Sequence, residues 1–206
     1  MKVIGVTGGV GSGKSEILHY LNTHYPCRIV MADEVGHEVM RRGQPAYEPL
    51  VNLLGSVPGG PLLDPDGEID RKEMAARIFS EESLRQQVNA LIHPAVRVYI
   101  EDEIAREREK EASGAADTPD YFILEAALLI ECGYRDVVDE MWYIYCDPKV
   151  RAERLLRSRG YSDEKTAAIC AGQLSEEAFR AGSDVVIDNS GDLADAFRQA
   201  DEALQR

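Results

Sequence analysis

The chain has 206 residues and a formal net charge of −14, because 37 Asp and Glu residues outnumber 23 Lys and Arg residues. This length is enough to bury a real core, in one compact domain with an insertion or in two small domains. The acidic balance argues against a broad polynucleotide-binding surface, which needs clustered Lys and Arg. It leaves room for a small anionic ligand in a local positive pocket.

Composition also bears on location and redox state. No stretch approaches the roughly 20 apolar residues of a membrane span, and the N-terminus lacks a charged-then-apolar signal, so we expect a cytoplasmic protein without a membrane partner. The cysteines are scattered, which predicts reduced, mostly buried thiols rather than a zinc site or a disulfide framework. They are Cys27, Cys132, Cys146 and Cys170.

The first motif follows an apolar run at residues 2–7 that is typical of a buried parallel strand. Residues 8–15 read Gly-x-x-x-x-Gly-Lys-Ser, the pattern of a phosphate-binding loop. Its glycines let backbone N–H groups curl around an anion, and a helix beginning near Gly13 adds the positive end of its dipole. In such loops the lysine, here Lys14, reaches the β- and γ-phosphates, and the hydroxyl of Ser15 can ligate Mg²⁺. Helical spacing at residues 16–21 disfavours the alternative, a merely flexible turn.

A second short strand is predicted at residues 27–31, followed closely by Asp33. Ligands of open parallel sheets bind beyond the carboxyl ends of the strands, so this carboxylate is expected near the phosphate loop. Helices are predicted at residues 34–41 and 46–54, and a Gly/Pro/Asp-rich loop at residues 55–67.

Three helical segments are predicted next. The first has Met74, Ile78 and Phe79 on one side. Ser83 and Gln86 resemble a capping box that starts the second. His93-Pro94 is expected to end it, with Pro94 opening a third helix that runs into the charged segment 106–111, interpreted as a solvated helix end.

Apolar runs at residues 121–125, 141–145 and 184–188 predict three further strands. Strands buried on both faces and separated by helices indicate an α/β protein with a five-stranded parallel sheet. We expect a single P-loop kinase domain over residues 1–206, with a helical acceptor-binding insertion at 34–112 and a helical lid at 147–182.

The lid segment carries Arg151, Arg154, Arg157 and Arg159. A P-loop kinase must close over the transferring phosphate and stabilise its charge, which favours a mobile cationic lid. The alternative is an exposed helix whose arginines pair with Glu153 and Glu164.

In order and spacing, these motifs resemble those of the dephospho-coenzyme A kinases, P-loop proteins related to the nucleoside monophosphate kinases. The matching positions are residues 7–15, Ala32, Asp33, His37, residues 67–71, Ile78, Phe79, residues 91–94, residues 128–131, Arg154, Gln173 and residues 184–191.

The resemblance implies ATP-dependent phosphorylation of the ribose 3′-hydroxyl of dephospho-coenzyme A, with ATP, Mg²⁺ and dephospho-coenzyme A as small-molecule partners and a monomer or small homo-oligomer as the assembly. The implied catalytic residues are Lys14, Asp33 and Arg154. The implied ATP-binding residues are Gly9, Val10, Gly11, Ser12, Gly13, Lys14, Ser15, Glu16, Asn189 and Gly191. The implied acceptor-binding residues are His37, Asp70, Arg71 and His93, and the magnesium ligands are Ser15 and Glu125.

Structural roles remain open for four of these residues. Asp33 and Asp70 could each cap the helix that follows. His93 could merely fix the helix junction before Pro94. Glu125 could be a structural acid at a strand end.

The chain also departs from the pattern of the family it resembles. A carboxylate is replaced by Met31, two expected arginines by Ser158 and Ile169, and other expected residues by Glu16, Ala127 and Ser183. Two alternatives therefore stay open: a related small-molecule P-loop kinase with another acceptor, and a non-catalytic paralogue that binds ATP or coenzyme A.

Overall fold

The computed structural model describes residues 1–79 and 81–206. It divides into two compact units, one formed by Met1–Val30 with Glu107–Arg206 and the other by Met31–Arg106. No helix of the described chain is long and apolar enough to cross a membrane. The strands are β1 (Lys2–Thr7), β2 (Cys27–Met31), β3 (Tyr121–Glu125), β4 (Glu140–Tyr145) and β5 (Val185–Asp188). The helices are α1 (Lys14–His24), α2 (Ala32–Val39), α3 (Tyr47–Gly55), α4 (Arg71–Phe79), α5 (Glu82–Ser113), η1 (Tyr134–Asp136), α6 (Pro148–Arg159), α7 (Asp163–Ala171), α8 (Glu176–Ala181) and α9 (Leu193–Leu204).

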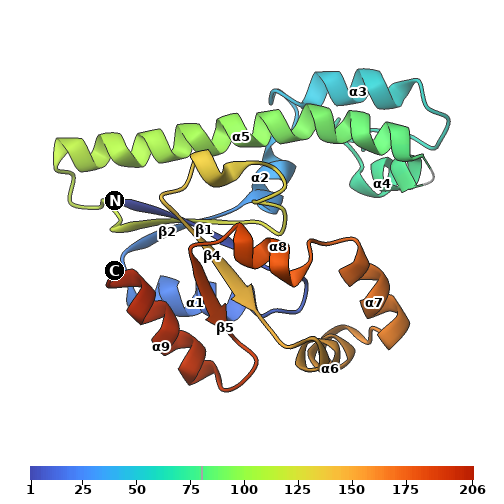
Figure 1. The fold of residues 1–206 in the computed structure, drawn as a ribbon. Helices are drawn as coiled ribbons and strands as arrows, with labels where there is room; N and C mark the ends of the chain where they lie inside the picture. The colour runs from blue at the N-terminus through green and yellow to red at the C-terminus, as the bar shows by residue number, and fades with distance from the viewer. Residues whose placement is uncertain (80) are drawn as a thin grey trace. The chain divides into compact units, whose positions relative to one another are not determined.

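The five strands form one parallel sheet in the order β2-β3-β1-β4-β5, which confirms the predicted fold class (Figure 1). β1 is central and pairs with β3 through Ile4 and Ile123, and with β4 through Gly5 and Met141. The observed strands agree with the predicted ones to within one residue at each end. Because β1 lies in the middle of the sheet, the loop that follows it starts at the centre of the carboxyl edge.

Helices α1 and α9 cover one face of the sheet (Figure 1). Ile17, Leu18 and Leu21 of α1 are buried there at helical spacing. α9 presents Ala196, Ala200 and Ala203, whose small side chains allow close approach to the sheet. This packing fixes α1 directly behind the phosphate loop.

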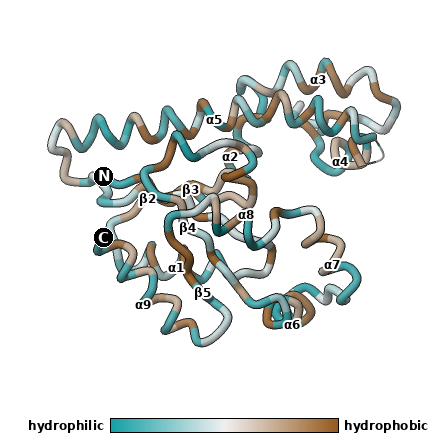
Figure 2. The backbone as a smooth tube through the Cα atoms, viewed as in Figure 1, coloured by the Kyte–Doolittle hydropathy of each residue, from teal (hydrophilic) through white to brown (hydrophobic). Residues whose placement is uncertain are grey.

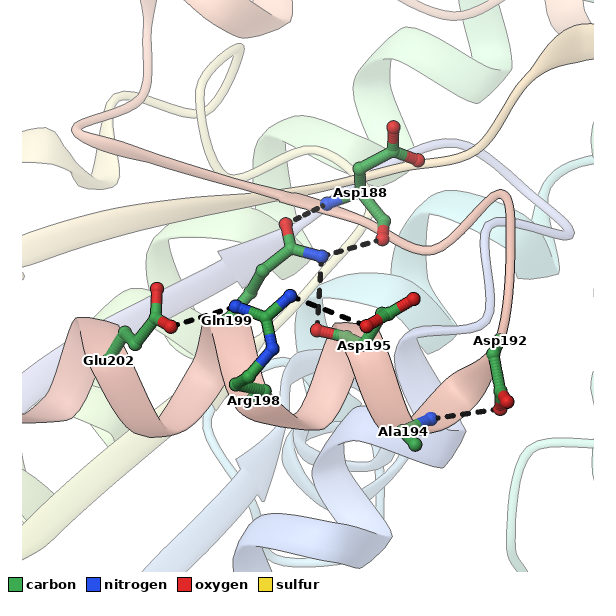
Figure 3. Close-up of polar contacts among 7 residues, drawn as sticks. All are labelled: Asp188, Asp192, Ala194, Asp195, Arg198, Gln199 and Glu202. Carbon is green, nitrogen blue, oxygen red and sulfur yellow. Dashed lines mark hydrogen bonds and ion pairs between the residues drawn. The ribbon is translucent and has the colours of Figure 1, made fainter.

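The carboxyl end of β5, an edge strand, is held by a side chain of α9 (Figure 3). Gln199 accepts a hydrogen bond from the Asp188 N–H at 2.9 Å and donates one to the Asp188 carbonyl at 3.0 Å. Asp192 caps α9 by accepting from the Ala194 N–H at 3.1 Å. The side-chain amide of Gln199 thus satisfies the backbone N–H and C=O of Asp188 at the edge of the sheet, and it fixes the start of the loop at Asn189.

In the unit Met31–Arg106, a buried arginine ties α4 to the loop after α3. Arg77 donates to the carbonyls of Leu54, Val57 and Gly60, and its Nε lies 3.0 Å from Glu73 Oε1. The predicted apolar side of α4 is wrong in part, because Phe79 is 91% exposed while Arg77 is only 9% exposed. One carbonyl in the last turn of α3 and two in the loop after it need a donor, and the Arg77 guanidinium supplies it.

The break predicted at His93-Pro94 is wrong, because α5 runs unbroken from Glu82 to Ser113 with Pro94 inside it. Ser83 accordingly lies within the helix instead of capping it. The tube through α5 alternates between teal and brown, consistent with buried Leu84, Val88 and Ile100 on one stripe of an otherwise polar helix (Figure 2). A long helix with such a stripe tolerates the one backbone N–H that proline removes.

Three capped helices make up residues 147–182. Asp147 caps α6, with Pro148 at its first position, and Ser162 and Ser175 cap α7 and α8. Phe179 of α8 stacks on Tyr143 of β4, with ring centroids 4.7 Å apart and planes 6° apart.

No cysteine of the described chain forms a disulfide, as expected. Cys146 is buried, whereas the other three are partly exposed, so the prediction of mostly buried thiols is wrong.

Candidate active site

The phosphate loop, residues 8–15, connects β1 to α1 as the strand–loop–helix pattern predicts. Gly8, Gly11 and Gly13 have φ of 148°, 80° and 87°, a region that favours glycine. Gly13 is the N-cap residue of α1, with no side-chain cap bond within the described chain. The first N–H groups of the helix are therefore directed into the loop, where they can donate hydrogen bonds to an anion.

Lys14 lies between the loop and the end of β3. Its Nζ donates to the Gly8 carbonyl at 2.8 Å and lies 3.6 Å from Glu125 Oε1. Both side chains are largely buried, at 14% and 9% exposure. This arrangement holds a positive charge inside the loop, and it gives Glu125 an observed ion-pair role beside its predicted role toward magnesium.

Asn189 braces the loop from the end of β5. The residue is fully buried, and its Nδ2 donates to the Ser12 carbonyl at 2.8 Å. The Nδ2 packs so closely on Gly13 that a Cβ there would collide with it. Buried Ser12 Oγ and Asn189 Oδ1 have no hydrogen-bond partner within the described residues. The implied ATP-binding role of Asn189 stays a prediction.

Arg154 of α6 approaches the loop on the same side as Asn189. Its Nη1 would lie 3.7 Å from a Cβ at Gly13, and it donates to Cys146 Sγ at 3.5 Å. Burial raises the pKa of the Cys146 thiol, and the guanidinium groups of Arg154 and Arg151 oppose that shift. Within the described chain no arginine of α6 forms an ion pair, so the predicted alternative of pairing with Glu153 and Glu164 is wrong.

Two further side chains contact the phosphate loop, and the sequence did not predict either contact. Gln173 Oε1 accepts from the Val10 N–H at 3.2 Å. Arg151 packs on Gly9, where a Cβ would collide with its Nη1. Gln173 belongs to a matched motif and Arg151 to the charged lid helix, and only the fold shows that both touch the loop.

In the unit Met31–Arg106, a cavity of about 450 Å³ contains two of the four predicted acceptor-binding residues. Its lining residues are Glu34, His37, Glu38, Met40, Arg41, Asp64, Glu68, Ile69 and Arg71. Asp70 is not among them, and its Oδ1 accepts from the Lys72 and Glu73 N–H groups, so its helix-capping role is confirmed. His93 lies on the surface in the middle of α5 rather than at a helix junction.

Asp33 is the second residue of α2 and is exposed. The N-cap position belongs to Met31, and within the described chain α2 has no side-chain cap bond, so the interpretation of Asp33 as a cap is wrong. Its carboxylate is not used to begin the helix.

The predicted magnesium donors are oxygen atoms, the kind this ion prefers. Ser15 is exposed at the start of α1, and Glu125 is buried beside Lys14. No group of three or more His, Cys, Asp or Glu side chains suited to a metal exists in the described chain. One or two protein oxygens suffice for Mg²⁺ when phosphates and water complete its shell, so the donor set fits an ion that arrives with a nucleotide.

This sheet order, with a Gly-Lys-Ser loop at the end of the central strand, defines a P-loop kinase. Solved structures share the fold: dephospho-CoA kinase from Campylobacter jejuni has a TM-score of 0.72 at 22% identity, covering 100% of this chain and 96% of that one. Shikimate kinase from Acinetobacter baumannii has a TM-score of 0.51 at 11% identity, covering 100% and 92%.

Sequence comparison narrows the class to one family. The dephospho-CoA kinase family profile matches residues 2–195. Dephospho-CoA kinases of Geobacter sulfurreducens and Streptococcus mutans are 35% and 33% identical over 202 and 205 residues, covering 98% and 100% of this chain and 96% and 97% of theirs. The chain belongs to the dephospho-CoA kinase family.

Proposed function

We propose that this protein transfers the γ-phosphoryl group of ATP to the ribose 3′-hydroxyl of dephospho-coenzyme A, giving coenzyme A and ADP. The observation that carries the proposal is the phosphate loop with Lys14 held inside it, in a chain of this family. We further propose that the enzyme acts in the cytoplasm as a monomer or small homo-oligomer.

The donor site is built by the loop. Backbone N–H groups from Gly9 to Ser15 bind the phosphates, and Glu16 is the next ATP-binding position, in the first turn of α1. Asn189 and Gly191 belong to the loop that lies beside adenine. Lys14 moves its hydrogen bond from the Gly8 carbonyl to the β- and γ-phosphates, and Arg154 stabilises the charge of the transferring group. The buried Ser12 Oγ, which has no hydrogen-bond partner among the residues that the structure describes, supports an anion at this place.

The acceptor reacts through Asp33. Its carboxylate orients the 3′-hydroxyl and takes its proton as the oxygen bonds to the γ-phosphorus and the bond to the bridging β–γ oxygen breaks. Its exposed position just after β2 supports this role, since ligands of parallel sheets bind beyond the strand ends.

The rest of the acceptor binds in the cavity that contains His37 and Arg71. Asp70 and His93, which do not line this cavity, are proposed as further contacts. Arg71 and Arg41 both line the cavity, and their guanidinium groups are suited to an anionic substrate.

Magnesium, held by Ser15 and through water by Glu125, would neutralise charge on the β- and γ-phosphates. The chain's own contribution is to fix the oxygens. Lys14 keeps the Glu125 carboxylate at the loop, and α1 keeps Ser15 there.

The test is incubation of the protein with Mg-ATP and dephospho-coenzyme A, measuring ADP and the 3′-phosphorylated product against Lys14→Ala. Product above that control supports the proposal. Absence of product overturns it, and ADP formed only with another acceptor would identify a related kinase instead. Binding of ATP without any transfer would identify a non-catalytic paralogue.

A further inference from the structure

We propose that Arg151 is a second phosphate-binding cation of the donor site and contacts the terminal phosphoryl group of ATP. The inference rests on the proposed kinase function. It assigns a role to a side chain that lies against the loop and that none of the roles above uses.

Arg151 packs on the N-terminal half of the phosphate loop, at Gly9 and Gly11. Its Nη1 occupies the space that a Cβ of Gly9 would need, and its Cγ would lie 3.1 Å from a Cβ at Gly11. Gly9 and Gly11 thus admit the guanidinium to the loop surface, just as Gly13 admits Asn189.

The hydrogen bonding of this guanidinium is incomplete within the described part of the chain. Within the described residues Arg151 forms no ion pair, and its Nε is buried without a hydrogen-bond partner. A partly buried positive charge with an unused donor is costly unless an anion completes it. The planar fork of arginine suits two oxygens of one phosphoryl group. Its positive charge also acts on its neighbours, because it lowers the pKa of Tyr143 against the larger, opposing effect of burial.

The helix places Arg151 and Arg154 together. They are three residues apart and face the same loop, Arg151 at Gly9 and Arg154 at Gly13. With Lys14 inside the loop, the two arginines leave an anion bordered by positive charge on several sides. Gly9 precedes the helix by five residues, whereas the N–H groups of Gly13 to Ser15 lie at its start. We therefore assign Arg151 to the terminal phosphoryl group, which the side chains of Lys14 and Arg154 also reach, and the backbone N–H groups at the helix start to the inner phosphates.

The other arginines of α6 are not placed to do this. Arg157 and Arg159 are exposed, and the Arg159 guanidinium lies 6.0 Å from the centre of the Tyr161 ring. At the two positions where an arginine was expected, Ser158 donates to the Arg154 carbonyl at 2.7 Å and Ile169 is apolar. Arg151 is then the cation that takes their place at the loop.

The experiment compares Arg151→Gln and Arg151→Lys with the matched control Arg157→Gln. Dissociation constants of ATP and ADP are measured by calorimetry. The values of kcat and KM are measured from ADP formation with dephospho-coenzyme A as the acceptor. For Arg151→Gln we expect a kcat about 10³-fold lower or more, as for lost arginines that stabilise a transferring phosphoryl group. We also expect ATP to bind about tenfold more weakly, while ADP binding and the KM for dephospho-coenzyme A stay unchanged. Arg151→Lys keeps the charge and should recover part of the ATP affinity.

Two results would overturn the inference: ATP affinity and kcat of Arg151→Gln equal to wild type, or equal weakening of ATP and ADP. Arg151→Lys retains the aliphatic stem at Gly11, so a folding defect in Arg151→Gln does not prevent the test. If the wild-type protein phosphorylates no dephospho-coenzyme A, the proposed function fails. The comparison of ATP with ADP then still decides the role of Arg151.

Discussion

Substitution of Asn189 by alanine tests whether the loop is held from the end of β5. The change removes the hydrogen bond to the Ser12 carbonyl, 2.8 Å long and buried, and leaves that carbonyl without its donor. An unsatisfied buried acceptor costs about 1–3 kcal/mol, so unfolding should become easier by that amount. The loop must be ordered before it binds phosphate. If the whole of this free energy is lost from binding, the affinity for ATP falls by about 5- to 150-fold.

The assay pairs urea denaturation with calorimetric titration of ATP. Asn22→Ala is the matched control, because Asn22 is exposed on α1 and accepts only a long contact from Cys27 Sγ at 4.0 Å. It should leave ATP affinity unchanged and change stability by less than about 1 kcal/mol. Binding of dephospho-coenzyme A should stay unchanged in both variants. An Asn189→Ala protein with wild-type stability and wild-type ATP affinity would refute the bracing role.

Three further substitutions test other features. Arg77→Met should lower the free energy of unfolding by about 3–5 kcal/mol, since Glu73 and three carbonyls lose a buried partner, while exposed Arg85→Met should be nearly neutral in the same denaturation assay. A hydrogen bond to Asp201, with burial, raises the pKa of Tyr25 to about 12, so the folded state holds this proton more tightly. Stability should fall as pH rises from about 10 to 12, and urea midpoints of Tyr25→Phe should show a shallower fall. Pro94→Ala should raise stability by about 1–3 kcal/mol by restoring a hydrogen bond within α5, and an unchanged denaturation midpoint would contradict this.

The sheet and the loop were predictable because their signals are local. The apolar run of β1 ends directly in the glycines. The loop needs glycine because Gly11 and Gly13 have positive φ values, which other residues rarely adopt. A strand buried on both faces has little freedom to begin or end elsewhere, which explains the agreement of the strand bounds.

The helical segments were harder, because local rules compete with packing. Pro94 is a helix breaker by propensity, yet burial of Leu84, Val88 and Ile100 along one stripe holds α5 together on both sides of it. The spacing of Phe79 predicts that it lies on the apolar side of α4. Nothing near it in sequence reveals that Arg77 is required by carbonyls about twenty residues earlier.

The candidate site was predictable where a motif contains its residues and not where distant segments meet. Lys14 lies within the loop motif, so its place followed directly. The contacts of Arg151 with Gly9 and of Gln173 with Val10 join residues more than 140 positions apart. No periodicity or spacing records such a contact.

The stacking of Phe179 on Tyr143 has a consequence for how the site responds to nucleotide. It fixes α8 to the sheet, while Asp147 at the start of α6 donates its N–H to Ser190 at 2.8 Å. Residues 147–182 are therefore attached at both ends, and Gln173, between α7 and α8, also accepts a hydrogen bond from the Val10 N–H of the phosphate loop. Arg151 and Arg154 lie in the first turns of α6, next to one attachment. Their charges are preorganised before ATP arrives, so little reorganisation energy is needed when the phosphoryl group transfers.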